Sequence, residues 1–215
     1  MPLEAPGPDH DLRAFPARVV AGGDKGERLF RVFRYRDPST GRRRPPFFFA
    51  SAYPDETGGG RYDLPLPDGA CYLATTALGA WLETFRGVGV VAVSDVQARR
   101  MLVTSPPRPL RAANLVAAAA RRFGVTAEIS TTNDYGLTRR WAAALRRAGF
   151  GALWGQARHD PTLRHRTLTL LDRAGDHLPF GWRWRHEVVR IDTNARLMAA
   201  VTASGFVVAE IPYDV

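Results

Sequence analysis

The chain has 215 residues, 45% of them hydrophobic, which suits one globular domain large enough to bury its own core. No apolar run approaches the roughly 20 residues needed to cross a bilayer. The opening residues carry Pro, Glu and Asp where a secretory signal needs positive charge and an apolar stretch. Cys71 is the only cysteine, which excludes an intramolecular disulfide and a cysteine metal cluster. These features predict a cytoplasmic protein without a membrane partner.

Basic residues outnumber acidic ones by 30 to 21, a formal net charge of +9 at pH 7. That balance favours an acidic partner, which is a nucleic acid, a nucleotide or an acidic protein. All but one of the basic residues are arginine, in a chain rich in Ala, Gly and Pro, which indicates a coding bias. The charge is spread along the chain, apart from a run at Arg42, Arg43 and Arg44. A nucleic-acid surface is therefore the less favoured interpretation.

Residues 1–27 are polar and rich in Pro and Gly, which predicts a loosely ordered N-terminal arm before a single domain at 28–215. Residues 28–35, RLFRVFRY, alternate basic and apolar side chains with the period of a half-buried strand. A loop and a short apolar segment at 47–50 follow. The next loop contains three glycines at 58–60, which permit tight turns or close approach of the backbone.

The middle of the chain predicts a strand, a helix and a second strand. Residues 70–76, ACYLATT, have the composition of a strand. Over 77–86 apolar residues recur at helical spacing, and Gly87 is expected to end this helix. Residues 88–93, VGVVAV, form the next predicted strand.

Two further helices are predicted, at 110–124 and at 134–149. Asp134 is the expected N-cap of the second, and Gly149 its C-terminal stop. Four strand-like segments follow the helices: 152–155, 166–172, 182–191 and 206–213. Strands outnumber helices, cluster at both ends of the chain and do not alternate regularly with them. The predicted class is therefore α+β.

Several weaker motifs are better explained as ordinary structure. HEVVR at His186 lacks the second histidine of a zinc-binding HExxH motif, and the five histidines show no ligand spacing, so no metal site is predicted. TGGGR lacks the ending of a phosphate-binding P-loop. Residues 182–186, WRWRH, interleave aromatic and basic side chains as single-strand nucleic-acid surfaces do. An edge strand with one buried aromatic face shows the same pattern and is favoured.

A sharper pattern surrounds the three glycines. Arg61, Tyr72 and Glu83 follow at equal intervals of eleven residues, on a predicted loop, strand and helix. A lone Glu on a helix is ordinarily a solvated residue, so the functional interpretation of Glu83 needs partners. Arg31 and Arg61 each offer a planar charged fork for a pyrophosphate, and Tyr62 or Tyr72 could stack on a ring. One carboxylate with arginines and tyrosines suits cleavage of an N-glycosidic bond, whose transition state resembles an oxocarbenium ion.

The segments LFRVFR, GGGRYDLPLPDGACYLATTALGAWLETF, WAAALRRAGFGALWGQARHDP and LTLLDRAG occur in an order that resembles the RES domain. This domain is the toxin half of bacterial Xre–RES toxin–antitoxin modules, and the likeness covers roughly residues 28–175. The resemblance implies an ADP-ribosyltransferase-like core of two small packed β-sheets with flanking helices. It also implies NAD as the substrate, consumed as a glycohydrolase or phosphorylase, with protein ADP-ribosylation in some members.

Residue by residue, the resemblance places the family's first Arg at Arg31, its Gly-Arg-aromatic Arg at Arg61, its Tyr at Tyr72 and its Glu at Glu83. It therefore implies that Glu83 and Tyr72 are catalytic, with Glu83 stabilising the ribosyl cation as nicotinamide leaves. Arg31 and Arg61 are expected to bind the NAD phosphates, with Tyr62 beside them.

The family's Ser is missing from this chain. Gln156 stands in its place in the segment LWGQARHDP, with Arg158 close behind. An amide donates and accepts hydrogen bonds, so Gln156 is included among the NAD-binding residues, but it cannot supply a hydroxyl. The acceptor of the ADP-ribosyl group, which is water, inorganic phosphate or a protein, stays open.

The resemblance also implies a helix-turn-helix antitoxin of the Xre type as partner, with a segment inserted into the active cleft. Three alternatives to an NAD-cleaving toxin remain. They are a protein ADP-ribosyltransferase, a non-enzymatic basic nucleic-acid-binding domain, and a catalytically silent RES-like domain kept for partner binding. Whether the chain forms a homo-oligomer is open as well.

Overall fold

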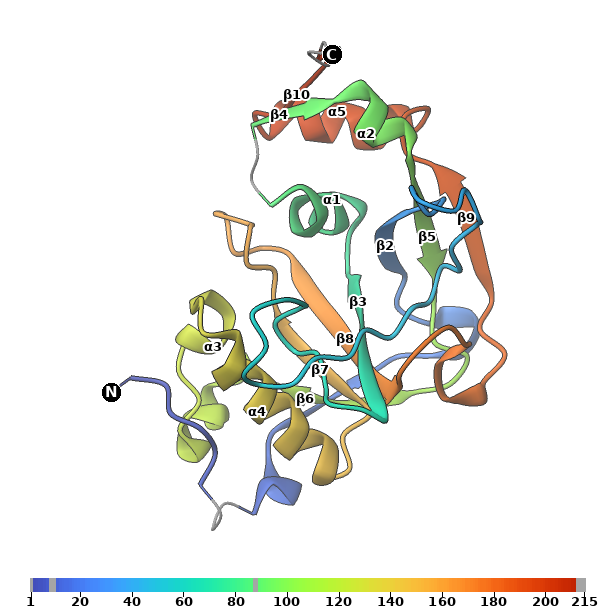
Figure 1. Cartoon of the computed structure of the whole chain (residues 1–215). Helices are drawn as coiled ribbons and strands as arrows, with labels where there is room; N and C mark the ends of the chain where they lie inside the picture. Colours follow the sequence, from blue (N-terminus) through green and yellow to red (C-terminus); the bar gives the residue numbers. More distant parts are fainter. Residues whose placement is uncertain (1, 8–10, 87–88, 212–215) are drawn as a thin grey trace.

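The structure is a computed structural model that describes residues 2–7, 11–86 and 89–211. In this part of the chain eight strands form one sheet, β4 and β10 form a second, and helices flank both (Figure 1). The strands are β1 (Ala17–Val20), β2 (Leu29–Arg34), β3 (Asp68–Ala74), β4 (Val90–Ala92), β5 (Arg99–Thr104), β6 (Leu110–Asn114), β7 (Ala152–Gln156), β8 (Arg166–Arg173), β9 (His186–Arg190) and β10 (Val207–Ala209). The helices are α1 (Ala77–Phe85), α2 (Val93–Gln97), α3 (Glu128–Thr131), α4 (Tyr135–Arg147) and α5 (Ala195–Ala203). The predicted α+β class is confirmed.

The eight-stranded sheet, in the order β1-β6-β7-β8-β3-β2-β5-β9, is nearly divided in two. β3 pairs with β8 along its whole length, and β2 does so with β5. β2 and β3 pair only at Phe30 and Ala74. We call β1-β6-β7-β8-β3 the β3 half-sheet and β2-β5-β9 the β2 half-sheet. Because their ladder is a single residue pair, the two half-sheets separate beyond it, as the resemblance to two packed sheets implied.

Helix α1 closes one end of this separation. Thr76 caps its N-terminus by accepting a hydrogen bond from the Gly79 amide at 2.9 Å. Trp81, Leu82 and Phe85 are buried against β2 and α5, and each large apolar side chain contributes about 1.5–3 kcal/mol on burial. The predicted helix is confirmed. Its last cap is Arg86 in the left-handed conformation, with φ 51°; Gly87, the predicted stop, lies outside the described residues.

Helix α4 covers the β3 half-sheet. Its predicted N-cap is confirmed, because the Asp134 carboxylate accepts from the Leu137 amide at 2.8 Å. Gly149 follows the helix with φ 90°, as a C-terminal stop requires. Trp141 lies fully buried on the inner face, in a core cluster with Phe15 and Phe150.

The helix predicted at 110–124 was wrong. Residues 110–114 are strand β6, which pairs with β1 on one side and β7 on the other, and a 3-10 helix covers 118–123. Alanine favours helix in isolation, but here Leu110, Ala112 and Ala113 are buried in a strand with neighbours on both sides. Strand pairing and burial outweigh a helix preference of a few tenths of a kcal/mol per residue.

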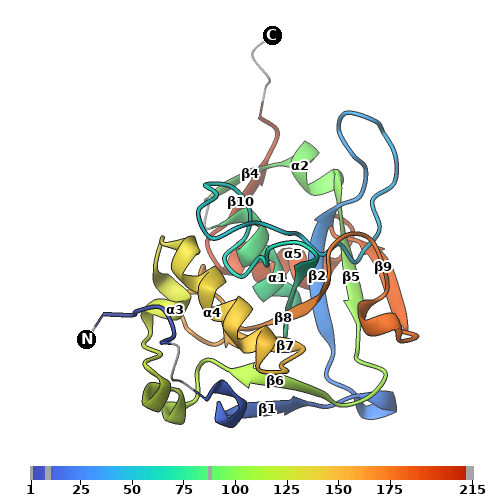
Figure 2. The ribbon, with the colours of Figure 1, turned by 60° about the horizontal axis from the view of Figure 1, so that its bottom comes forward.

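The N-terminal residues differ from the expected loose arm. β1 pairs with β6 from Ala17↔Ala113 to Val20↔Leu110, and Figure 2 shows the two strands side by side. Leu12 and Phe15, just before β1, are buried in the core. The segment is tied down because its apolar side chains complete the layer beneath α4.

Other differences lie in the second half of the chain and around β5. β5 and α5 were not predicted. The strand expected at 182–191 begins only at His186, where its pairing with β5 starts, and the rings of Trp182 and Trp184 stack with centroids 6.5 Å apart in the preceding loop. The strand expected at 206–213 is the short β10, and its last two predicted residues lie outside the described part. Among the described residues no helix is long and apolar enough to span a membrane.

Candidate active site

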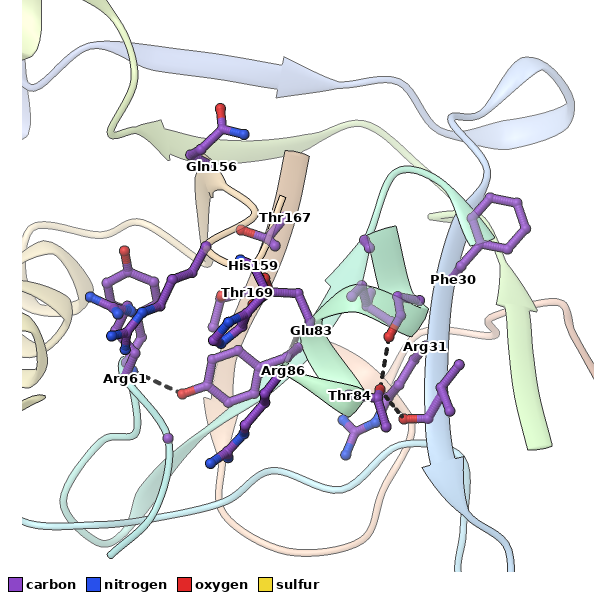
Figure 3. Close-up of a pocket in the computed structure, with 18 of the residues that line it drawn as sticks. Phe30, Arg31, Arg61, Glu83, Thr84, Arg86, Gln156, His159, Thr167 and Thr169 are labelled. Carbon is purple, nitrogen blue, oxygen red and sulfur yellow. Dashed lines mark hydrogen bonds between the residues drawn. The ribbon is translucent and has the colours of Figure 1, made fainter. Parts of the chain in front are cut away.

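A cavity of about 280 Å³ opens where β2 and β3 separate, bounded by α1 and the first residue of α4. All six residues singled out from the sequence line it: Arg31, Arg61, Tyr62, Tyr72, Glu83 and Gln156. Among the described lining residues Glu83 is the only carboxylate. Figure 3 shows Glu83 among Arg86, His159 and Thr169, with Gln156 apart from this group.

The glycine loop that leads to Arg61 is held by hydrogen bonds from the side chain of Arg139 of α4. This arginine is fully buried. Its Nε donates to the Gly60 carbonyl at 3.0 Å, and Nη1 donates to the carbonyls of Tyr53 and Glu56, both at 2.8 Å. Nη2 donates to the Gly58 carbonyl. One guanidinium therefore fixes the backbone of the whole loop from 53 to 60.

A buried carboxylate ties the same loop to β3. Tyr72 donates its hydroxyl to Asp63 Oδ1 at 2.6 Å, and the Gly60 amide donates to Asp63 Oδ2 at 2.6 Å. The Tyr62 amide in turn donates to the Tyr72 hydroxyl at 2.9 Å. Burial raises the pKa of Asp63, and the hydrogen bonds from Tyr72 and Gly60 offset only part of this rise. Burial, together with the Asp63 charge, raises the pKa of Tyr72 well above its usual value, so Tyr72 is a neutral phenol.

Close approach explains two of the three glycines. Gly59 has φ +83°, which side chains rarely adopt, and a Cβ there would lie 2.8 Å from Asp63 Oδ2. A Cβ at Gly60 would lie 2.4 Å from the Tyr72 hydroxyl oxygen and 2.7 Å from Asp63 Oδ1. Gly58 has open space at its Cβ position and no such φ. The requirement for glycine is therefore at 59 and 60.

Arg61 is a buried cation with an unused donor. Only 9% of the residue is exposed. Its Nη1 donates to the Ile129 carbonyl at 3.3 Å, while Nη2 is buried without a hydrogen-bond partner in the described structure. The guanidinium lies over the ring of Tyr135, 5.0 Å from its centroid. Burying an unpaired donor of a charged group is costly, so this site favours an anion.

Glu83 is oriented by the loop that follows β7. Its Oε1 accepts the backbone amide of His159 at 3.0 Å. Burial lowers the pKa of His159, and Arg158, Arg86 and Arg61 lower it further against the opposing effect of Glu83. The imidazole beside Glu83 is therefore neutral at pH 7.

Tyr62 and Gln156 line the cavity with their polar groups already occupied. The Tyr62 hydroxyl donates to the Ile129 carbonyl at 2.9 Å, its ring belongs to the core, and burial raises its pKa to about 12. The Gln156 amide nitrogen donates to the His165 carbonyl at 2.9 Å, and its oxygen accepts from Arg166. Tyr62 thus supports the Arg61 loop, and the aromatic ring that stacks on Arg61 is Tyr135.

Sequence reasoning missed several lining residues. Thr167 and Thr169 bring hydroxyl groups from β8, where Thr169 is the register partner of Tyr72. Their two-residue spacing places both on one face of the strand, a signal that could have found them. Arg86 follows Glu83 by three residues, so helical spacing also pointed to it. Tyr135 and His159 had no such signal.

Arg31 reaches the cavity from β2. Its Nη1 donates to the Phe48 carbonyl at 3.2 Å and lies 2.6 Å from Cys71 Sγ. Figure 3 shows Arg31 and Arg61 on opposite sides of the pocket. Among the described residues no group of three or more His, Cys, Asp or Glu side chains is placed to hold a metal ion.

Comparison with known proteins agrees with this architecture. The family model of the RES domain matches residues 28–183. Among solved structures the chain is similar to the crystal structure of the M. tuberculosis MbcT–MbcA toxin–antitoxin complex. The TM-score is 0.52 at 17% identity, with 89% of this chain and 94% of that chain covered. At this identity the likeness shows the fold alone. No curated protein matches the chain.

Proposed function

The chain belongs to the RES domain family, and from that premise we propose that it is a toxin that cleaves the nicotinamide–ribose bond of NAD. One observation carries the proposal: the only carboxylate among the described lining residues, Glu83, shares the cavity with the buried guanidinium of Arg61, whose Nη2 has no hydrogen-bond partner in the described structure. An enzyme that hydrolyses ordinary glycosides uses two carboxylates. A substrate with a cationic leaving group needs no acid to protonate it.

The phosphates of NAD would pair with the arginines. Arg61 has a buried N–H donor without a partner, and a phosphate oxygen would satisfy it with a charge-assisted hydrogen bond. Tyr135 keeps the guanidinium plane oriented from one face. Arg31 supplies a second cation from β2. The pyrophosphate would then be held between the two half-sheets.

The bond-breaking step follows from the placement of Glu83. As the bond between ribose C1′ and the nicotinamide nitrogen breaks, its electron pair goes to the ring nitrogen and neutral nicotinamide leaves. Positive charge develops on the ribose, where the Glu83 carboxylate stabilises it. The His159 amide holds Glu83 in place. Tyr72 is neutral and hydrogen-bonded to Asp63, and it would pack against the nicotinamide-ribose end of NAD without taking a proton.

The incoming group forms the new bond to C1′ through an oxygen; water then releases a proton to solvent, whereas phosphate attacks through an oxygen that is already deprotonated. We propose water or inorganic phosphate as this acceptor, and Thr167 and Thr169 as the hydroxyl donors that position it. Gln156 is not available for this task because Arg166 and the His165 carbonyl engage its amide. It contributes by shaping the wall of the cavity.

The test is NAD turnover by the purified protein, with and without inorganic phosphate, beside Glu83→Gln. We expect the variant to lose about 100- to 1,000-fold in kcat, the size of effect seen when a single charge-stabilising group is removed. Glu187→Gln, at an exposed carboxylate on β9, is the matched control and should keep full activity. Phosphate dependence would identify phosphorolysis. Equal turnover by wild type and Glu83→Gln would refute the assignment, and a mass increase on a protein would identify a transferase.

We further propose a helix-turn-helix antitoxin as the partner that restrains this activity, and the cytoplasm, which contains NAD, as its location. Expression of the chain alone should then deplete cellular NAD and stop growth. Glu83→Gln should relieve both effects. Growth arrest that persists with the variant would disconnect toxicity from NAD loss.

A further inference from the structure

A second hollow, of about 570 Å³, adjoins the first along β2. It lies between β2, the loop at 37–45 and Phe48, and it shares Arg31 and Val32 with the active-site cavity. We call it the basic hollow because five arginines line it, against two aspartates: Arg31, Arg34, Arg42, Arg43 and Arg44, with Asp37 and Asp176. The two cavities are therefore neighbours along β2, and Arg31 lines both.

Two of these five arginines already have carboxylate partners. Arg44 pairs with Asp37 at 2.5 Å, and Arg34 pairs with Asp95 at 3.1 Å. Arg42 and Arg43 have no carboxylate within 4.0 Å in the described part of the chain. Arg43 lies over the ring of Tyr35 at 5.5 Å, a contact that leaves the edge of the guanidinium free to donate.

The first cavity is too small for a whole dinucleotide. Pockets that hold drug-sized ligands measure roughly 300–1,000 Å³, and 280 Å³ lies below that range. A dinucleotide would therefore extend beyond it. Phe48 lines the basic hollow with 47% of its surface exposed and accepts from Arg31 through its carbonyl. An exposed aromatic ring among arginines suits a purine and its phosphates.

Charge matching then distinguishes between dinucleotides. Arg31 and Arg61 balance the two negative charges of a pyrophosphate. Since Arg34 and Arg44 have carboxylate partners, the hollow retains Arg42 and Arg43 against Asp176, a surplus of one positive charge. A phosphate monoester carries about −1.5 to −2 at pH 7. Arginine is also the residue that accommodates the 2′-phosphate of NADP in other dinucleotide-binding sites.

We propose that the basic hollow binds the adenosine half of the substrate, that Arg42 and Arg43 pair with a phosphate on its ribose 2′-oxygen, and that the chain therefore prefers NADP to NAD. The preference in turnover rests on the proposed function. The preference in binding does not, because the adenosine half can bind whether or not the chain cleaves the dinucleotide. Because both arginines are exposed, the preference should weaken as salt rises.

The experiment compares adenosine 2′,5′-bisphosphate with AMP as calorimetric ligands for the purified chain, and NADP with NAD as substrates. Wild type should bind the bisphosphate about tenfold more tightly than AMP, as one charge-assisted contact provides. It should show a similar preference in kcat/KM for NADP. Arg42→Ser combined with Arg43→Ser should remove both preferences, so that the bisphosphate binds no more tightly than AMP and kcat/KM for NADP falls to the value for NAD. Arg121→Ser with Arg122→Ser, at exposed arginines far along the chain, is the matched control and should keep both.

Equal affinity of wild type for the two adenosine ligands would overturn the proposal, as would a preference that survives the double substitution. If wild type turns over neither dinucleotide but binds the bisphosphate more tightly than AMP, the proposed function is refuted and the hollow remains an adenosine 2′-phosphate site. If wild type cleaves NAD but shows no preference for NADP, the proposed function stands and the proposed role of the hollow is refuted.

Discussion

Replacement of Gly60 by Ala tests how the glycine loop positions the site. The added Cβ would lie 2.4 Å from the Tyr72 hydroxyl oxygen and 2.8 Å from its Cζ. The Tyr72 ring packs against the core and the loop is held by Arg139, so neither can give way easily, and the hydrogen bond from Tyr72 to Asp63 must break or stretch. The matched control is Gly58→Ala, whose Cβ has nothing within 4 Å.

The magnitude follows from two contributions. Overpacking a well-packed site costs about 1–3 kcal/mol, and loss of a hydrogen bond to a charged group costs about 1.5–3 kcal/mol. A combined loss of at least about 2.5 kcal/mol in the free energy of unfolding corresponds to a Tm lower by at least roughly 5–10 °C in a chain of this size. Displacement of Tyr72 should also lower kcat/KM for NAD at least about tenfold, since 1.36 kcal/mol corresponds to tenfold.

Differential scanning calorimetry and NAD turnover measure the two effects on the same preparations. Gly58→Ala should match wild type in both. The reasoning is refuted if Gly60→Ala also matches wild type, because the close approach of Gly60 to Tyr72 would then have no energetic consequence. A lower Tm with unchanged kcat/KM would separate the packing role of the loop from its role in the site.

Three further predictions concern the groups around this loop. Tyr62→Phe should lower the unfolding free energy by about 0.5–1.5 kcal/mol in urea titration, because the Ile129 carbonyl loses the nearer of its two donors and keeps only Arg61 Nη1, and should keep NAD turnover. Burial raises the Tyr62 pKa from 10.0 to about 12, so wild-type stability should fall as pH rises from about 10 to 12, and Tyr62→Phe should lose less there. Asp63 has a raised pKa, so kcat/KM should decline on acidification at a pH above 3.8; an unchanged acid limb in Asp63→Asn would contradict this. Arg139→Lys keeps the positive charge but loses the planar guanidinium and its several N–H donors, and should raise KM for NAD more than it lowers kcat.

Local patterns predicted the elements whose signals agree with their surroundings. The helix α4 has a capping Asp134 and a terminal Gly149, and the apolar face of α1 has helical spacing, so both were found. The segment at 110–124 failed because its alanines favour helix while its neighbours β1 and β7 demand a strand. The N-terminal segment looked polar, yet Leu3, Leu12 and Phe15 are buried in the core and β1 pairs with β6.

The sequence predicted which residues line the site better than it predicted how their polar groups are oriented. All six selected side chains line one cavity, since the family motif carries them through loop, strand and helix. The direction of each polar group depends on partners far away in sequence. Tyr62 turns to the Ile129 carbonyl, and Gln156 turns to Arg166, so neither presents its polar group as the motif suggested.

The amino-acid sequence by itself determined the α+β class, the capped helices and the set of candidate residues, because caps, periodicity and motif spacing are local properties. The tertiary structure alone decided that β2 and β3 meet at one residue pair and then separate, which creates the cavity. It also decided that Arg139 reaches back to hold the loop at 53–60, and that Arg61 is buried with a free donor. These features depend on strand pairing and burial between segments distant in the chain, and such contacts have no counterpart in a local pattern.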